Sequence, residues 1–145
     1  MKNTNELIGL LDSCQRSSGS HKASMPRFQQ LVNQDVSTQF ILNALNLALQ
    51  VPKKEACVDR LLVFLTNACS QNGIFAENIL SHVIGCMESS EKQVRMKAVQ
   101  LAGDVLRVLP GDGDDLSDDL WESLEDILIR RLDDRNATVR ANAVR

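Results

Sequence analysis

Residues 94–99 read Val-Arg-Met-Lys-Ala-Val, and the pattern returns at residues 139–144 as Val-Arg-Ala-Asn-Ala-Val. Sliding the chain over itself by 45 residues aligns 79–100 with 124–145, with five of the 22 positions identical. In each copy the Val faces a partner helix, and the Ala four residues later lets the two helices approach closely. The sequence therefore predicts a repeat of about 45 residues built from two packed helices.

A period near 45 residues is typical of HEAT repeats and is longer than that of tetratricopeptide repeats. Because one helical hairpin cannot bury all its apolar surface alone, neighbouring hairpins stack into a superhelix. We predict an all-α fold, a right-handed α-solenoid of HEAT repeats, interpreted as a fragment of a longer solenoid whose last hairpin is truncated. About four hairpins are expected, at residues 5–33, 37–70, 74–108 and 117–145.

Apolar residues recur at spacings of three and four along the chain, and no segment alternates with a period of two. Helices are predicted at about 5–15, 22–33, 37–50, 54–70, 74–88, 91–108 and 117–132, with an eighth after Asp134. Val51-Pro52 should end the third helix, since the residue before a proline avoids the helical region. Gln71-Asn72-Gly73 should close the fourth with a residue suited to a left-handed cap.

The composition favours helices packed on helices. Apolar residues make up 43% of the chain but aromatic residues only 3%, so Leu, Val, Ile and Ala must supply the core. The net charge of −3 is unevenly distributed, because residues 110–126 hold eight acidic groups and no basic one. The rest of the chain is net positive, so an anionic partner is not excluded.

Several classes of function find no support in the sequence. No CxxC pair occurs, so a zinc site is not expected, and Cys57, Cys69 and Cys86 are predicted to be buried reduced thiols. His21 and His82 lack neighbours at a catalytic spacing. The absence of a signal peptide and of a long apolar run indicates a soluble intracellular chain without a membrane partner.

Three local motifs are better explained by ordinary structure. The acidic segment 112–119 lacks the ligand and the glycine that a calcium-binding EF-hand loop needs at its fifth and sixth positions. Asn136-Ala-Thr138 matches a glycosylation sequon but is interpreted as a helix cap. Gly111 and Gly113 lie among acidic residues that would repel phosphate, so they do not form a phosphate-binding loop.

Three collinear segments carry a family resemblance: KKEACVDRLLVFLTNAC (53–69), ENILSHVIGCMESSEKQVRMKAVQLAGDVLRVLP (77–110) and LWESLEDILIRRLDDRNATVRANAV (120–144). They present a basic turn before an acid-containing helix, a hairpin with VR, an acidic loop, and a helix followed by VR. In this order they resemble the amino-terminal HEAT repeats of condensin subunit 3, the chromosome-associated protein G family. The resemblance covers about residues 20–145, and the first 20 residues match weakly.

The resemblance implies a non-catalytic subunit that needs no cofactor and takes no small-molecule substrate. Its expected partners are the kleisin subunit, through it the SMC ATPase pair, and double-stranded DNA, in mitotic chromosome condensation at the nucleus and chromosome. A protein-only HEAT adaptor of the importin, phosphatase-scaffold or cohesin-regulator kind is the alternative. A HEAT-like enzyme such as a DNA glycosylase would need a catalytic acid in a basic groove, and no isolated candidate stands out.

Cations recur at or just after the predicted hairpin turns. Equivalent positions align along one edge of a solenoid, so these residues would form a stripe that contacts a phosphate backbone rather than bases. Charged residues that simply fill solvated turns are the other interpretation. The resemblance places Lys53 and Lys54 first among candidate DNA contacts. The remaining candidates are Lys22, Lys92, Lys97, Arg130 and Arg131.

Arg95 and Arg140 are the arginines of the repeated VR pair. One interpretation is a structural ladder in which each reaches a carboxylate of its own or the adjacent turn, with Glu88 and Asp133 as candidates. The other is a direct contact with a ligand.

Overall fold

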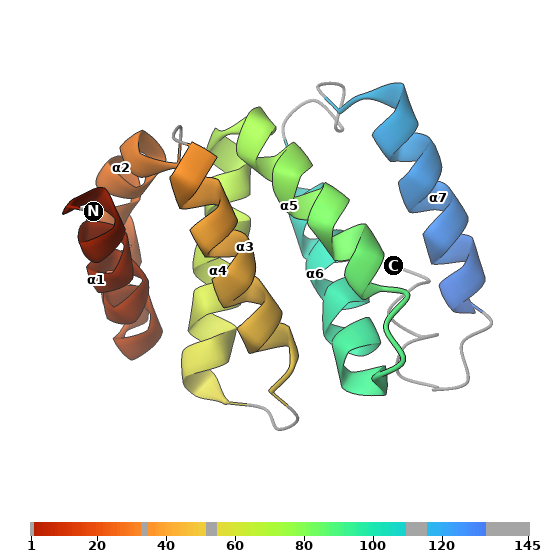
Figure 1. Cartoon of the computed structure of the whole chain (residues 1–145), viewed down its shortest axis with the longest axis horizontal. Coiled ribbons are helices and arrows are strands. Elements are labelled where there is room, and N and C mark those ends of the chain that lie inside the picture. The colour runs from red at the N-terminus through yellow and green to blue at the C-terminus, as the bar shows by residue number, and fades with distance from the viewer. Residues whose placement is uncertain (1, 33–34, 52–54, 110–115, 133–145) are drawn as a thin grey trace. The chain divides into compact units, whose positions relative to one another are not determined.

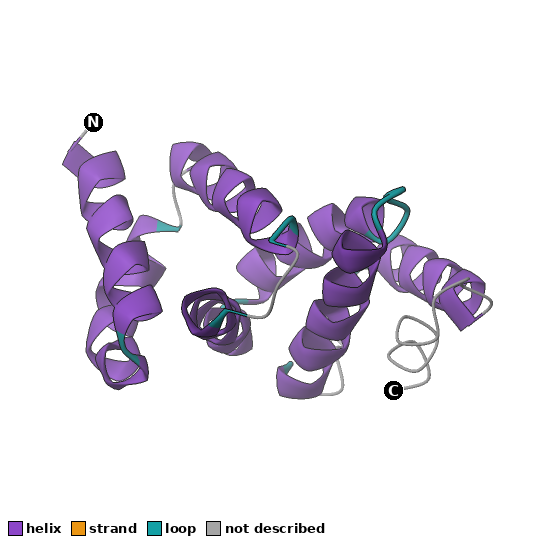
Figure 2. Ribbon diagram, turned by 90° about the horizontal axis from the view of Figure 1, so that it is seen from below, coloured by secondary structure: helices purple, strands orange, loops and turns teal. Residues whose placement is uncertain are grey.

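The structure is a computed structural model that describes residues 2–32, 35–51, 55–109 and 116–132. The predicted helices that fall in these ranges are confirmed, and no strand occurs among the described residues (Figures 1 and 2). The eighth predicted helix, and with it Arg140, lies outside them. The elements are α1 (Lys2–Arg16), a 3-10 turn η1 (Ser18–Ser20), α2 (His21–Leu31), α3 (Asp35–Leu49), α4 (Ala56–Gln71), α5 (Gly73–Cys86), α6 (Lys92–Val108) and α7 (Asp118–Leu132).

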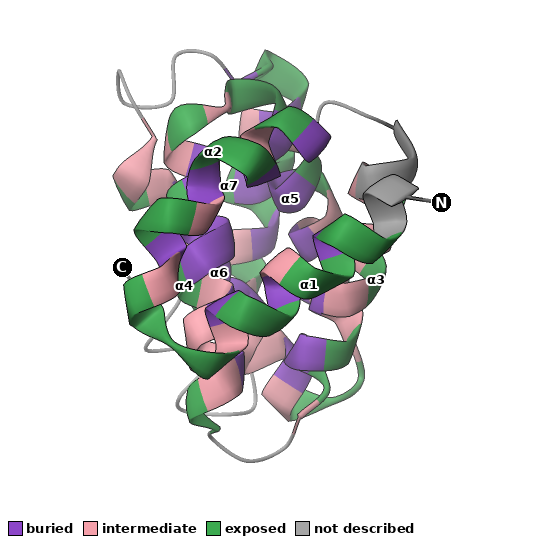
Figure 3. Ribbon diagram, turned by 90° about the vertical axis from the view of Figure 1, so that its left-hand side faces the viewer, coloured by how far each residue is buried: buried purple, intermediate pink, exposed green. Residues whose placement is uncertain are grey.

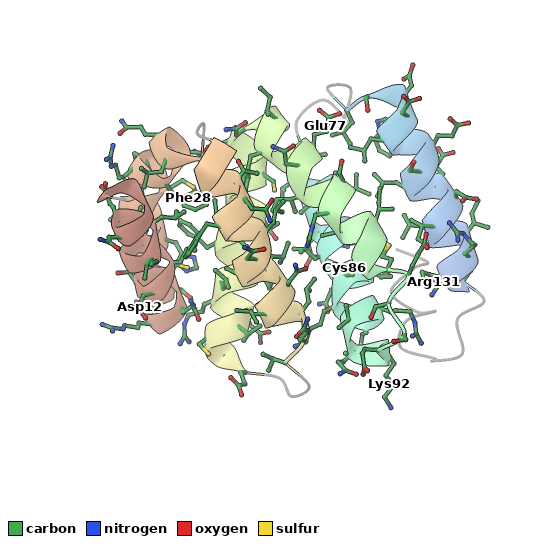
Figure 4. The ribbon with its side chains drawn as sticks, viewed as in Figure 1. Asp12, Phe28, Glu77, Cys86, Lys92 and Arg131 are labelled. Carbon is green, nitrogen blue, oxygen red and sulfur yellow. The ribbon has the colours of Figure 1, made fainter. Side chains whose placement is uncertain are left out.

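The chain divides into two compact units, Met1–Ala68 and Cys69–Arg145. In the first unit α1 packs against α2 and α3. Its core contains two fully buried rings, Phe28 of α2 and Phe64 of α4, whose centroids lie 4.9 Å apart in an edge-to-face arrangement. Figure 4 shows Phe28 directed into the interior of this unit. Two of the five aromatic residues, Phe28 and Phe64, therefore meet in the contact between α2 and α4.

A bidentate ion pair also joins α1 to α2. The guanidinium of Arg27 donates from Nε to Glu6 Oε1 at 2.5 Å and from Nη2 to Glu6 Oε2 at 2.7 Å. The hydrogen bond from Arg27 lowers the pKa of Glu6. The two planar groups match in geometry and add a directional contact between the two helices.

In the second unit α5 packs against both α6 and α7. Ala98 and Ala102 of α6 are fully buried, and Val94 is 7% exposed. The predicted roles of Val94 and Ala98 are therefore confirmed, since a small side chain at a buried position allows close helix packing. Figure 3 shows the same pattern throughout the described residues, with buried positions forming stripes along the helices.

The predicted left-handed cap at Gln71-Asn72-Gly73 is wrong. Asn72 has an extended backbone, with φ −149° and ψ 102°, and its side chain accepts a hydrogen bond from the Phe75 amide at 3.1 Å. Gly73 is already the first residue of α5. Asn is among the strongest N-cap residues, so here it starts the next helix and the glycine does not end the previous one.

Candidate nucleic-acid interface

The α1–α2 turn is held by serine side chains. Ser17 Oγ accepts a hydrogen bond from the Gly19 amide at 3.1 Å. Ser20 Oγ donates to the Ser13 carbonyl at 3.0 Å and to the Ser17 carbonyl at 2.9 Å. The backbone amides of Ser17 and Ser20 already donate to the Ser13 and Ser17 carbonyls, so the Ser20 hydroxyl adds a second donor to each. The turn is thus fixed without using any of its cations.

Lys22, the candidate cation of this turn, is the second residue of α2 and is exposed. No ion pair links it to another residue in the part of the chain that the structure describes. Its ammonium group is therefore available to an anionic partner.

Two arginines near this turn were not among the predicted site residues. Arg60 of α4 donates from Nε to the carbonyl of Gln15, at the end of α1, at 2.6 Å. Arg16 pairs with Asp12 at 2.7 Å on the exposed face of α1. Arg60 lies near the start of the second helix of its hairpin, as Arg95 does, and this shared position is the sequence signal that could have identified it.

Arg95 holds the α5–α6 turn. Its Nη1 donates to the carbonyls of Ser89 at 3.0 Å and Ser90 at 3.2 Å. Ser89 Oγ accepts from the Glu91 amide at 3.1 Å. Arg95 therefore stabilises this turn by donating to backbone carbonyls. The predicted contact of Arg95 with a carboxylate stays a prediction.

Arg130 makes a second link at the same end of this unit. Its Nη2 lies 3.3 Å from Glu88 Oε1, just past the end of α5, and 3.0 Å from Asp126 Oδ2, one turn earlier on α7. All three side chains are half or more exposed. Two carboxylates share the charge of Arg130, which reduces its attraction for a phosphate relative to an unpaired cation.

Lys92 and Arg131 lie at this end as well, where α6 starts and α7 ends (Figure 4). Lys92 is exposed, whereas Arg131 and Lys97, which follows more than one turn later on α6, are half-buried. In the second unit Lys92, Arg130 and Arg131 all lie toward the end where α6 starts and α7 ends. Lys53 and Lys54 fall outside the described residues, and a continuous stripe along the whole chain stays a prediction.

The histidines and cysteines have structural surroundings. His21 is buried, its Nε2 donates to the Cys14 carbonyl at 2.9 Å, and its ring contacts Phe64 edge to face. Burial lowers the pKa of His82. Burial raises the pKa of Cys14 to about 11 and that of Cys69 to about 12. Both thiols are therefore poor nucleophiles near neutral pH.

The predicted burial of the thiols is confirmed for Cys69, whereas Cys57 and Cys86 are only half-buried. Among the described residues no group of three or more His, Cys, Asp or Glu side chains is arranged to hold a metal ion. No described helix is both long and apolar enough to cross a membrane.

Comparison with known proteins agrees with the resemblance read from the sequence. No protein-family model matches the chain. It is 29% identical over 143 residues to condensin complex subunit 3 of Schizosaccharomyces pombe, an alignment that covers 94% of this chain and 16% of the relative. The chain is similar to condensin complex subunit 3 over nearly its whole length. It thus spans about a sixth of this condensin subunit.

A solved condensin structure shows the same fold. The crystal structure of the S. pombe condensin Cnd3–Cnd2 subcomplex matches with a TM-score of 0.82 and 28% identity, over 95% of this chain and 18% of that chain. The predicted resemblance to condensin subunit 3 and the predicted all-α HEAT-repeat fold are both confirmed.

Proposed function

We propose that this chain is a non-catalytic HEAT-repeat segment of condensin that binds the kleisin subunit and contacts the backbone of double-stranded DNA. Through the kleisin it would join the SMC ATPase pair, which would hydrolyse ATP during mitotic chromosome condensation. The chain would then act in the nucleus, on chromosomes. The similarity to condensin complex subunit 3, whose S. pombe counterpart was crystallised as a Cnd3–Cnd2 subcomplex, supports this proposal most strongly.

The cations at the hairpin turns support the DNA part of the proposal. Lys22 and Lys92 are exposed at the starts of α2 and α6, the second helices of their hairpins. Side chains of this kind bind phosphates as point charges and carry no information about base sequence. The proposed contact is therefore with the DNA backbone, and Lys53 and Lys54 are its first candidates by resemblance.

The test is a titration of a labelled duplex of mixed sequence with the protein assembled with its kleisin. Affinity should fall steeply between ~50 and ~200 mM salt, and each lysine that contacts a phosphate should contribute about 1 to the log–log salt slope. Reversing Lys53 and Lys54 to Asp should weaken duplex binding without melting the fold, and Lys22→Gln should reduce the slope by about 1.

Arg107→Gln is the matched control for Lys92→Gln. It removes the same charge from the opposite end of α6, where Arg107 pairs with Asp104. Lys92→Gln should weaken binding and Arg107→Gln should not. Unchanged affinity of the Lys53/Lys54 double variant at low salt would reject those residues as contacts.

A protein-only scaffold is the second candidate, because at the α5–α6 turn Arg130 already faces two carboxylates. In that case the protein would retain its kleisin but would bind duplex only weakly, and Lys22→Gln would not alter that binding.

A further inference from the structure

The exposed serines of the α1–α2 turn differ in what their hydroxyl groups do. Ser17 Oγ caps the 3-10 turn, and Ser20 Oγ makes two hydrogen bonds to backbone carbonyls. Ser18 lies between them, is exposed, and its hydroxyl makes no hydrogen bond to the described part of the chain. Ser18 can therefore be modified without removing a bond that holds the turn, whereas Ser17 and Ser20 cannot.

Ser18 also precedes by four residues a lysine, Lys22, that forms no ion pair within the described part of the chain. The backbone is helical from Ser18 through η1 into α2, with φ −80° and ψ −13° at Ser20 and φ −59° and ψ −46° at His21. Ser18–Ser20 is a 3-10 turn that continues into α2, so little more than one helical turn separates Ser18 from Lys22. A phosphate on Ser18 would therefore lie within reach of the long Lys22 side chain. Lys22 is exposed and, as shown above, has no ion-pair partner among the described residues.

The charges around this turn favour an added anion. Arg16, Lys22 and Arg60 all lie at it or beside it, and Asp12 is paired with Arg16. The α5–α6 turn is different, because Glu88 and Glu91 flank Ser89 and Ser90, and Arg95 at this turn already donates to the carbonyls of both serines. A phosphate on Ser18 would gain an ammonium partner, whereas one on Ser89 or Ser90 would face adjacent carboxylates.

We propose that Ser18 is a phosphorylation site whose phosphate group pairs with Lys22 and thereby weakens the contact of this turn with DNA. In the reaction, the Ser18 hydroxyl oxygen bonds to the γ-phosphorus of a nucleoside triphosphate held by a protein kinase. The bond from that phosphorus to the β–γ bridging oxygen breaks, the nucleoside diphosphate leaves, and the hydroxyl proton passes to the kinase. The effect on DNA rests on the proposed function, whereas the pairing with Lys22 does not.

The pairing is tested without DNA. Phosphoserine is incorporated at position 18 of the protein in its kleisin complex, and its second ionisation is followed by phosphorus NMR. That ionisation ordinarily has a pKa of about 6. Lys22 should lower it, and the variant Lys22→Gln should return it toward the ordinary value. The same pKa with and without Lys22 would overturn the pairing.

The effect on binding is tested with the same proteins and the labelled duplex. Phosphorylated protein should bind about tenfold more weakly at ~50 mM salt, because one phosphate contact is lost and a repulsive charge is added. In Lys22→Gln the modification should have a much smaller effect. Equal affinity of the two forms, when the unmodified protein does bind duplex, would overturn the regulatory effect. Failure of the unmodified protein to bind would instead refute the proposed function, and the NMR result would still stand.

The modification itself is tested by phosphopeptide mass spectrometry of the protein isolated from dividing cells of its own source. Phosphate on Ser18, absent from a Ser18→Ala strain, is the expected result. Detection of the peptide only in its unmodified form through the cell cycle would overturn the assignment.

Discussion

The turns between α1 and α2 and between α5 and α6 are built differently, although each joins two helices that pack against each other. Ser17 and Ser20 hold the first turn through their hydroxyl groups, and Lys22 has no ion pair with another described residue. Arg95 holds the second turn through two carbonyls, and the neighbouring Arg130 is shared between Glu88 and Asp126. A cation at a hairpin turn is therefore structural or available according to the carboxylates and carbonyls within its reach. Its position in the repeat alone does not decide which.

The cores of the two units also differ. In the first unit the buried rings of Phe28 and Phe64 contact each other, whereas the second unit buries the ring of Phe75 and the small side chains of Ala98 and Ala102. The first unit should therefore depend strongly on a single large side chain.

Removing that side chain should produce the largest effect. Phe64 is fully buried and contacts the rings of Phe28 and His21, at centroid distances of 4.9 and 5.2 Å. Phe64→Ala should lower the free energy of unfolding by about 3–5 kcal/mol, measured by urea denaturation. Val63→Ala, at the neighbouring position that is 53% exposed, is the control and should change it by less than about 0.5 kcal/mol. Similar costs for the two variants would contradict the ring-centred core.

A smaller effect should separate the two cations at the start of α6. Arg95→Met removes the donor to two turn carbonyls and should cost about 1 kcal/mol, because the bonds are charge-assisted but partly solvated. Lys92→Met, three residues earlier and exposed, should cost almost nothing. Thermal melting of the two variants measures the difference. If Lys92→Met were the more damaging change, Arg95 would not be the residue that holds this turn.

The smallest effect concerns pH and the Glu6–Arg27 pair of the first hairpin. Because pairing lowers the pKa of Glu6, the folded state binds this proton less tightly than the unfolded state. Its stabilising contribution is therefore complete above the ordinary glutamate pKa and is lost as pH falls through the lowered value. Glu6→Gln removes this contribution, so it should lower Tm slightly near neutrality. In the acid range the Tm of the variant should fall less steeply with pH than that of the unmodified protein.

Glu88→Gln is the matched variant in the second unit. Glu88 meets Arg130 through a single 3.3 Å contact, whereas Glu6 has a bidentate pair. Glu88→Gln should therefore lower Tm at neutral pH less than Glu6→Gln does. An equal change would show that bidentate geometry is not what distinguishes the two pairs.

The helices and their packing faces were predictable from the sequence, because apolar spacing and the Val94–Ala98 pattern depend on local periodicity. The role of Asn72 was not, because Asn72-Gly73 can either end one helix or cap the next, and the fold decides between them. The partners of Arg95 were equally hidden, since backbone carbonyls at a turn leave no mark in the sequence. Arg60 was missed because its partner, Gln15, lies 45 residues away in the preceding hairpin. The candidate cations could be named from their spacing, but the carboxylates around Arg130 emerged only in three dimensions.

The Arg60–Gln15 bond has a practical consequence for any scan that neutralises basic residues one at a time. A substitution at Arg60 would release the end of α1 and so disturb the position of Lys22, although Arg60 need not touch DNA. The Arg60 variant would then bind DNA more weakly because Lys22 is displaced, and this result would look like the loss of a direct contact between Arg60 and DNA. Each arginine substitution should therefore also be made in a protein that carries Lys22→Gln. If the substitution acts only by displacing Lys22, it should not weaken DNA binding further in that background.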